Sequence, residues 1–223
     1  MKSNFFLRVI ILLFCLNCAL PSLAREIPPV EAKNWVEDKG HRLLNTFVEP
    51  DIAKKYATLD EMLLSYIDLD YVSRFVIGKY WRQMSAGQQV EYQALFKRYA
   101  LSIYKGFPLN FDSSAIDFEI VNAVSEPDGA MVRAKIKLNT ADSQGQPPVS
   151  DIFVDFKLID KNDGIKIIDL KLGESSLILA YRSRFYEMMA KDDNDITWFM
   201  EDLTDITDAA ERTNRETLRQ SEY

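Results

Sequence analysis

Residues 70–96 read DYVSRFVIGKYWRQMSAGQQVEYQALF, and this stretch decides how the first half of the chain folds. Its apolar residues recur at steps of three and four, which is typical of one face of a helix. The two apolar stripes comprise Val72, Phe75, Val76 and Tyr80 and then Tyr92, Leu95, Phe96, Tyr99 and Ile103. Between them, Ser85 lies three residues before Gln88, the spacing of a capping box that starts a helix. The stretch therefore predicts two consecutive helices with an aromatic inner face.

The residues before this pair also favour helices. Pro28-Pro29 suits the first turn of a helix running from Val30 to Phe47, because proline is tolerated there. Pro50-Asp51 ends that helix. We expect two short helices next, over Asp51–Tyr56 and Leu59–Tyr66.

After Gly106-Phe107-Pro108, the pattern changes to an alternation of period two, which predicts strands. The expected strands cover Ile116–Ile120, Val132–Leu138, Ile152–Leu158 and Ile165–Leu172. The turns between them are Pro127-Asp128-Gly129, Gly145-Gln146-Pro147-Pro148 and Asn162-Asp163-Gly164. Such short connections favour a four-stranded antiparallel meander. The last strand is apolar on both faces, so it is either central in the sheet or interrupted by a bulge.

Two further helices are expected over Ser176–Lys191 and Asp195–Leu203. Residues 205–223 are polar and charged, which predicts a frayed helix or a C-terminal tail. Helices, then strands, then helices indicate an α+β fold, with the helices packed against one curved sheet. We expect one such domain over residues 25–204.

The N-terminus has the features of a secretory signal. Lys2 and Arg8 precede the apolar run Val9–Leu20, and Ser22-Leu23-Ala24 fits a cleavage site after Ala24. A lipoprotein anchored at Cys15 or Cys18 and an uncleaved anchor are the alternatives. Both cysteines lie within the signal, so the exported chain has no disulfide.

The charge of the chain argues against nucleic acid as a partner. The whole chain carries a net charge of −7, and loss of residues 1–24 leaves 25 Lys plus Arg against 34 Asp plus Glu, a net charge of −9. Such a surface also adheres weakly to anionic lipid headgroups. Good solubility explains the same charge equally well.

Few residues are arranged for catalysis. His41 is the only histidine and has no fixed acidic neighbour, so we expect it to be solvated or lightly packed. Gly173–Ser176 lacks the second glycine of a nucleophile elbow, and Asp192–Asp195 lacks the glycine and terminal glutamate of a calcium loop. The sequence therefore predicts no catalytic residue, no metal site and no cofactor.

Two blocks of sequence resemble the MlaC family, also called the toluene-tolerance family. The first block contains Arg74, Ile77, Gly78, Tyr80, Trp81, Arg82, Gln88 and Phe96. The second contains Asp169, Ser176, Tyr181, Arg182, Phe185 and the helix Asp195–Leu203. The resemblance spans about residues 28–204. It implies a periplasmic phospholipid carrier, with helices and a curved sheet enclosing an apolar cavity, somewhat like nuclear-transport-factor-type cones.

The resemblance also implies what the carrier contacts. The partners are phospholipid, the substrate-capture subunit of an inner-membrane ABC transporter, and an outer-membrane lipoprotein complex; the carrier itself is expected to be a monomer that maintains outer-membrane lipid asymmetry. The candidate lipid contacts are Phe75, Val76, Tyr80, Phe96, Tyr99, Ile103, Val132, Ala134, Ile136, Val154 and Phe156. For each of them an ordinary place in the core is nearly as plausible. Arg182 and Arg184 either pair with local carboxylates or face a phosphate or a partner.

Three other functions stay open. A carrier of another lipid, such as a hopanoid, has the same sequence features. An enzyme would need an acid–base pair such as Asp155 with Tyr99, and a chaperone-like protein would have a filled core. One departure from the family pattern also affects the site: this chain has Gly173-Glu174 where the family commonly has Glu-Gly.

Overall fold

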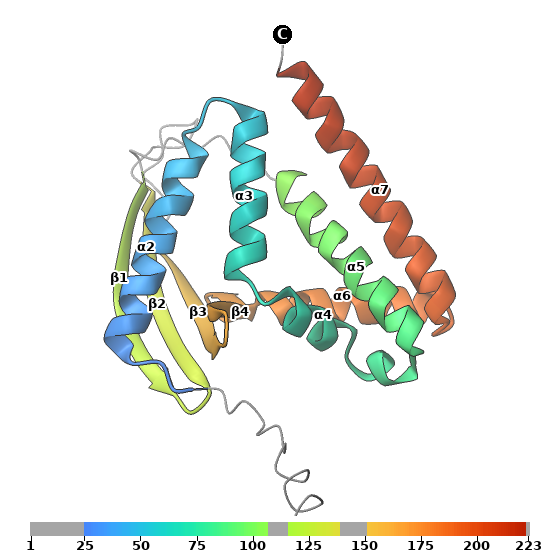
Figure 1. Cartoon of the computed structure of the whole chain (residues 1–223), viewed down its shortest axis with the longest axis horizontal. Coiled ribbons are helices and arrows are strands. Elements are labelled where there is room, and N and C mark those ends of the chain that lie inside the picture. Colours follow the sequence, from blue (N-terminus) through green and yellow to red (C-terminus); the bar gives the residue numbers. More distant parts are fainter. Residues whose placement is uncertain (1–24, 107–115, 139–150, 222–223) are drawn as a thin grey trace, which may run out of the picture.

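The computed structural model describes residues 25–106, 116–138 and 151–221, and its helices and strands form an α+β fold with one open sheet (Figure 1). The expected signal over residues 1–24 and the expected turn over 145–148 lie outside this range. Among the described residues, no helix has both the length and the apolar composition needed to cross a membrane.

The N-terminal half is helical, as predicted. Its elements are α2 (Pro29–Phe47), α3 (Ile52–Tyr66), α4 (Leu69–Ile77), the 3-10 helix η1 (Gly78–Gln83), α5 (Ala86–Ile103) and the 3-10 helix η2 (Tyr104–Gly106). The prediction of two short helices after residue 50 was wrong, because α3 is continuous. No glycine or proline interrupts residues 52–66, and one buried stripe of Tyr56, Leu59 and Met62 runs along the helix.

The helix pair of residues 70–96 is confirmed. The Ser85 hydroxyl accepts a hydrogen bond from the Gln88 N–H at 3.3 Å, and the Gln88 side chain accepts one from the Ser85 N–H at 2.9 Å. This capping box starts α5. At the other break, Gly78 has a φ of 56° and ends α4.

The sheet is an antiparallel meander of five strands, where four were predicted. Its strands are β1 (Ile116–Glu126), β2 (Gly129–Leu138), β3 (Ile152–Lys161), β4 (Gly164–Leu172) and β5 (Ser175–Ser176), paired in that order. Strand β5 has only two residues, so it shows no alternation that sequence analysis could detect.

The bulge predicted as one alternative for the last long strand is present. The pairing of β3 with β4 shifts where Leu158 pairs with Ile167 and Lys157 with Asp169, which leaves Ile168 as the extra residue. A second shift lies between Ile120 and Asn122 in β1. Bulges bend the strand that carries them, so both contribute to the curvature of the sheet.

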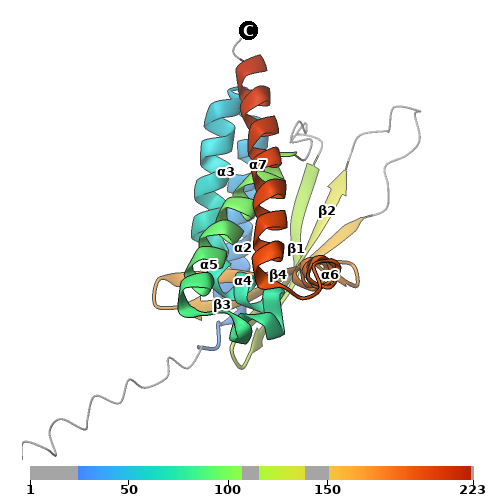
Figure 2. The ribbon, with the colours of Figure 1, turned by 90° about the vertical axis from the view of Figure 1, so that its right-hand side faces the viewer.

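Helix α2 packs on one face of the sheet (Figures 1 and 2), and the opposite face carries ion pairs. The core between them includes Ala32 and Val36 of α2 with Val132 and Leu158 of the sheet, each at most 2% exposed. On the other face, Arg133 pairs with Asp155 at 2.6 Å across two strands. The alternation in the sequence correctly separates these two faces.

The second core is helical and aromatic. Helices α6 (Leu177–Lys191) and α7 (Ile196–Gln220) pack with α4 and α5 around rings that include Tyr92, Phe96 and Phe185. Helix α7 continues through residues 205–220, where we expected a tail or a frayed helix. Its second half is held to α5 by ion pairs from Arg98 to Asp208 and Glu211.

Candidate functional site

A partly open apolar pocket lies where α3, α4, α5, β4 and α6 meet. Its volume is about 260 Å³. It is lined by Leu63, Ile67, Leu69, Val72, Phe96, Tyr99, Ala100, Tyr104, Ile167, Ile168, Asp169, Leu170, Leu177, Ile178 and Tyr181. Nearly all of these side chains are aliphatic or aromatic, so the pocket suits an apolar ligand and offers few directional contacts.

The start of α6, which forms one wall of the pocket, is fixed by Asp169. One carboxylate oxygen of Asp169 accepts a hydrogen bond from the Ser176 hydroxyl at 2.7 Å, and the other accepts one from the Ile178 N–H at 3.2 Å. The Ser176 oxygen in turn accepts the Leu179 N–H and caps the helix. Asp169 therefore connects the end of the sheet to the helix beside the pocket.

The glycine that departs from the family pattern lies in the turn before this cap. Gly173 has a φ of 59°, and its N–H donates to the Phe153 carbonyl at 3.2 Å. Glycine adopts this conformation without steric cost. In this chain the glycine is the left-handed residue of the turn, and Ser176 beyond the turn donates to Asp169.

The tyrosines of the pocket are kept neutral by their surroundings. Burial raises the pKa of Tyr99, and the nearby charge of Arg184 only partly opposes this rise. Burial, followed by the hydrogen bond to Asp60, also raises the pKa of Tyr104. The Tyr99 hydroxyl has no hydrogen-bond partner among the described residues. None of these groups is prepared to act as a base near neutral pH.

Of the helical residues predicted as lipid contacts, Phe96 and Tyr99 line the pocket. Val76 is fully buried in the helical core, and Ile103 packs against that core. The Tyr80 hydroxyl donates to the Asn194 side chain at 2.5 Å. Phe75 lies under the guanidinium of Arg182, 5.1 Å from its ring centre. The stripes of residues 70–103 therefore divide between the pocket, the core and the surface.

The predicted sheet residues lie on the face that α2 covers, outside the lining of the pocket. Val132 pairs with Phe156 and Ala134 with Val154, so each pair shares this face. Ile136 continues the row, paired with Ile152, which is 36% exposed. Beside them, Leu172 pairs with Val154 and is 55% exposed.

These pairings leave an apolar strip at the end of the sheet. Leu170 lines the pocket, and Leu172 follows it two residues later on the same face of β4. The pocket wall thus continues into the strip formed by Ile136, Ile152, Val154 and Leu172. Contact of this strip or of the pocket with lipid stays a prediction.

The two arginines lie on different flanks of α6. Arg182 faces α4, where its guanidinium lies over the Phe75 ring, and it also donates to the Tyr186 hydroxyl of α6 at 3.1 Å. Arg184 is exposed, and its charge acts on Tyr99 and Tyr181. Neither arginine forms an ion pair with any residue in the described part of the chain. Pairing with local carboxylates, the first alternative from the sequence, is therefore absent from this region.

Sequence reasoning missed most of the pocket wall. The missed residues include Ile67, Ala100, the stretch Ile167–Leu170 and the start of α6 at Leu177 and Ile178. One signal was available: Ile165–Leu172 is apolar on both faces, which is unusual for a strand with one solvated face. Both faces of this strand are apolar because both are covered. Ile67 pairs with Ile167 and brings α3 and α4 against the edge of β4.

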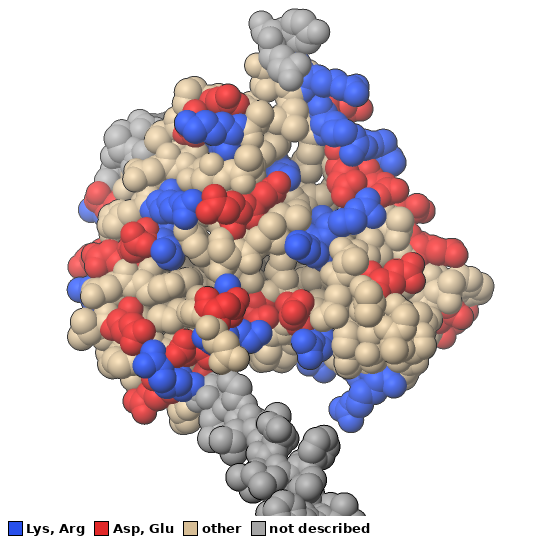
Figure 3. All heavy atoms as spheres, viewed as in Figure 1, with Lys and Arg blue, Asp and Glu red and all other residues tan. Residues whose placement is uncertain are grey.

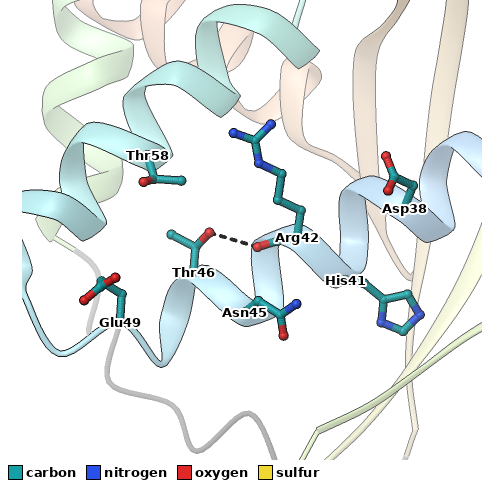
Figure 4. A pocket seen from close by; sticks show the side chains of 7 residues that line it. All are labelled: Asp38, His41, Arg42, Asn45, Thr46, Glu49 and Thr58. Carbon is teal, nitrogen blue, oxygen red and sulfur yellow. Dashed lines mark hydrogen bonds between the residues drawn. The ribbon is translucent and has the colours of Figure 1, made fainter.

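A polar pocket of about 420 Å³ lies between α2 and α3, and it contains the only histidine (Figure 4). Its side chains diverge: Arg42 points toward α3, while His41 points away from it. Arg42 is engaged by Glu61 and Tyr66, and the His41 ring packs edge-on to Phe118 at 5.9 Å. The prediction that His41 is lightly packed is confirmed, and the pocket gathers no set of catalytic groups.

The acid–base pair that an enzyme would require is not assembled. Asp155 accepts two hydrogen bonds from Arg133, at 2.6 and 2.7 Å, which hold its pKa below the usual range. Tyr99 lies among the rings of the helical core. Within the described residues, no group of three or more His, Cys, Asp or Glu side chains could hold a metal ion.

The fold and the pocket define a class of protein: an α+β domain with an open sheet and an apolar site beside it. Among solved structures, the chain is similar to the phospholipid-binding protein from Ralstonia solanacearum in complex with a phospholipid, determined at 1.53 Å. The match has a TM-score of 0.62 at 17% identity and covers 80% of this chain and 98% of that one. This likeness establishes the fold.

The family model for the MlaC protein matches residues 42–205, nearly three-quarters of the sequence. The chain belongs to the MlaC family. The resemblance found in the two sequence blocks is thereby confirmed. No curated protein matches the chain by sequence.

Proposed function

We propose that this protein is a periplasmic phospholipid carrier that moves lipid between the outer membrane and an inner-membrane ABC transporter. The observation that carries the proposal is the apolar pocket between α3–α6 and β4, in a chain of the MlaC family. The solved neighbour that shares the fold holds a phospholipid. Phospholipid is therefore the ligand class that we assign to this pocket.

The energetics of such a ligand favour many weak apolar contacts. Burying about 30 methylene groups at about 0.8 kcal/mol each gives roughly 24 kcal/mol relative to water. This exceeds the practical ceiling of about 18–21 kcal/mol for noncovalent affinity. Binding must therefore be compared with the bilayer, where the acyl chains are already out of contact with water. The carrier needs only a site that is about as apolar as the bilayer.

The size of the pocket sets a further requirement. At about 260 Å³ it lies below the range of roughly 300–1,000 Å³ that ligand pockets usually span. Two acyl chains therefore need more room than this conformation offers. The exposed apolar strip at Leu172 and Ile152 is the surface on which the chains would continue.

The test begins with the full chain, including residues 1–24, expressed in a Gram-negative host. The purified protein is extracted with organic solvent, and the extract is analysed by mass spectrometry. We expect phospholipid in stoichiometric amounts. Protein that is empty and that also takes no phospholipid from vesicles would rule out the proposal, whereas a hopanoid in the extract would favour that alternative ligand.

The location and the partners need separate measurements. Cell fractionation should recover the protein in the periplasmic fraction, with an N-terminus at Arg25. Transfer of labelled phospholipid to a reconstituted ABC transporter or to an outer-membrane lipoprotein complex tests the two partners. A protein found only in the cytoplasm would contradict the location.

A further inference from the structure

Two cations between α4 and α6 lack a counter-ion. Lys79 and Arg182 form no ion pair with any carboxylate in the described part of the chain, and some other cations there, such as Arg74 and Arg184, form none either. The acidic residues of the neighbouring elements, Asp70, Glu187 and Asp193, are exposed and form no ion pair with either. Elsewhere positive and negative side chains are interspersed over the visible face (Figure 3).

Both cations are held against one tyrosine. The Tyr186 hydroxyl accepts hydrogen bonds from the backbone N–H of Lys79 and from the Arg182 guanidinium, each at 3.1 Å. The Lys79 ammonium lies 5.7 Å and the Arg182 guanidinium 5.2 Å from the centre of the same ring. Two like charges near one ring repel each other, and an anion that contacted both would remove this repulsion.

Arg182 is held in place by its neighbours before any ligand binds. The Arg182 guanidinium lies between the rings of Phe75 and Tyr186, and only one of its N–H groups is committed to a protein acceptor. Gly78 allows the Tyr186 side chain to approach the backbone at the end of α4, because a Cβ at residue 78 would lie 2.5 Å from the Tyr186 oxygen. Since the Tyr186 oxygen already accepts two donors, its own O–H is free to donate.

We propose that Lys79, Arg182 and Tyr186 bind a phosphate group. The guanidinium fork and the ammonium match phosphate oxygens, and charge-assisted hydrogen bonds of this kind are the strong ones. The phosphate comes either from free phosphate or from the phosphodiester of a lipid headgroup. The second source rests on the proposed function.

The position of the site is compatible with a lipid headgroup. Ile178 lines the apolar pocket, and Arg182 follows it four residues later on α6, a rise of about 6 Å along the helix axis. On α4, Val72 lines the pocket, and Phe75 follows one turn later. A phosphate at Arg182 thus lies about one helical turn from the apolar site.

The first experiment titrates the full-length protein with inorganic phosphate and with glycerophosphoethanolamine by calorimetry. We expect saturable binding that weakens with added NaCl, because salt screens the charges. Arg182→Gln and Lys79→Gln should each weaken binding by about 10- to 100-fold, the loss of one hydrogen bond to a charged group. Arg212→Gln, which removes an exposed charge on α7, should leave it unchanged.

The second experiment loads each variant from vesicles of phosphatidylglycerol or of diacylglycerol, which lacks the phosphate. If the bound phosphate belongs to a lipid headgroup, Arg182→Gln should lower loading of phosphatidylglycerol and leave loading of diacylglycerol unchanged. If both lipids load equally while inorganic phosphate still binds, the site takes free phosphate. Thermal melts identify variants that fail to fold. If Arg182→Gln does not fold, the titration of the wild type and of Lys79→Gln decides whether the phosphate site exists.

The outcomes separate this site from the carrier function. Absence of saturable binding by the wild type, or binding untouched by both substitutions, overturns the phosphate site even if phospholipid is extracted. Phosphate binding by a protein that takes up no lipid supports the site and removes the carrier function.

Discussion

Gly78 is the residue at which backbone conformation and packing are most tightly linked. Its φ is 56°, and an added Cβ would lie 2.5 Å from the Tyr186 oxygen and 2.9 Å from the Arg182 guanidinium. Gly78→Ala should therefore lower the free energy of unfolding by about 1–3 kcal/mol, the cost of a strained backbone residue. Urea denaturation followed by circular dichroism measures this change.

Gly87 provides the matched control. It lies in the first turn of α5, and a Cβ there would meet only the Ser85 oxygen, at 4.0 Å. Gly87→Ala should be neutral or raise stability by up to about 1 kcal/mol, because alanine favours the helix. Equal losses in the two variants would show that the left-handed conformation of Gly78 is unimportant.

The ion pair between Arg133 and Asp155 predicts a dependence of stability on pH. The hydrogen bonds from Arg133 lower the pKa of Asp155 below that of the unfolded chain. The pair therefore stabilises the protein at neutral pH, and this contribution is lost as the pH falls below about 4 through the folded pKa. Urea unfolding at pH 7 and pH 3 should show a smaller difference for Asp155→Asn than for the wild type. An unchanged difference would contradict this assignment.

Local rules predicted some residues well and others poorly. The capping box of Ser85 and Gln88 depends only on residues three apart, so sequence alone located it. Phe75 and Phe96 both lie on predicted apolar stripes, yet only Phe96 lines the pocket. Which stripe residue meets the pocket depends on the placement of β4 and α6, and the spacing within one helix does not contain that information.

At the scale of elements, α7 shows how a polar stripe can pack. Its residues 205–220 contain few apolar side chains, which is why the sequence predicted a frayed helix or a tail there. The stripe toward α5 includes Thr207 and Asn214, which are buried. The Asn214 amide donates to the Ser102 carbonyl at 2.9 Å, and Arg98 bonds to Asp208 and Glu211. Hydrophobic periodicity cannot detect a contact made by such polar groups.

Removal of residues 205–223 should therefore destabilise the helical core. The deletion leaves the Ser102 carbonyl without its buried partner and exposes the side of α5 that α7 covers. We expect a loss of at least about 2 kcal/mol, since the lost hydrogen bond contributes about 0.5–1.5 kcal/mol and the apolar surface of α5 that becomes exposed to water adds to it. Deletion of residues 222–223 should change nothing. A dispensable tail would instead give two deletions of equal stability, measured by chemical denaturation.

At the scale of the molecule, two cores meet at β4. One core joins α2 to the sheet, the other joins α4–α7, and the apolar pocket lies between them. The sequence predicted the order of elements and the covered face of the sheet because both follow from local periodicity. It did not predict the walls of the pocket, because those depend on how the two cores are placed against each other.

Filling the pocket tests whether this junction holds the lipid. Ala100 lines the pocket on α5, and Ala94 lies on the exposed side of the same helix. Ala100→Trp should occupy the apolar space and lower phospholipid uptake from vesicles about tenfold or more, a loss of at least about 1.4 kcal/mol in binding. Ala94→Trp adds the same ring to the surface and should load normally.

The stability of these two variants completes the test, because a ligand that binds the folded state raises the melting temperature. Lipid should raise the melting temperature of the wild type and of Ala94→Trp, while Ala100→Trp should melt at the same temperature with and without lipid. An Ala100→Trp protein that folds, loads and is stabilised as well as the wild type would place the lipid elsewhere. The strip of Ile136, Ile152, Val154 and Leu172 would then be the next surface to substitute.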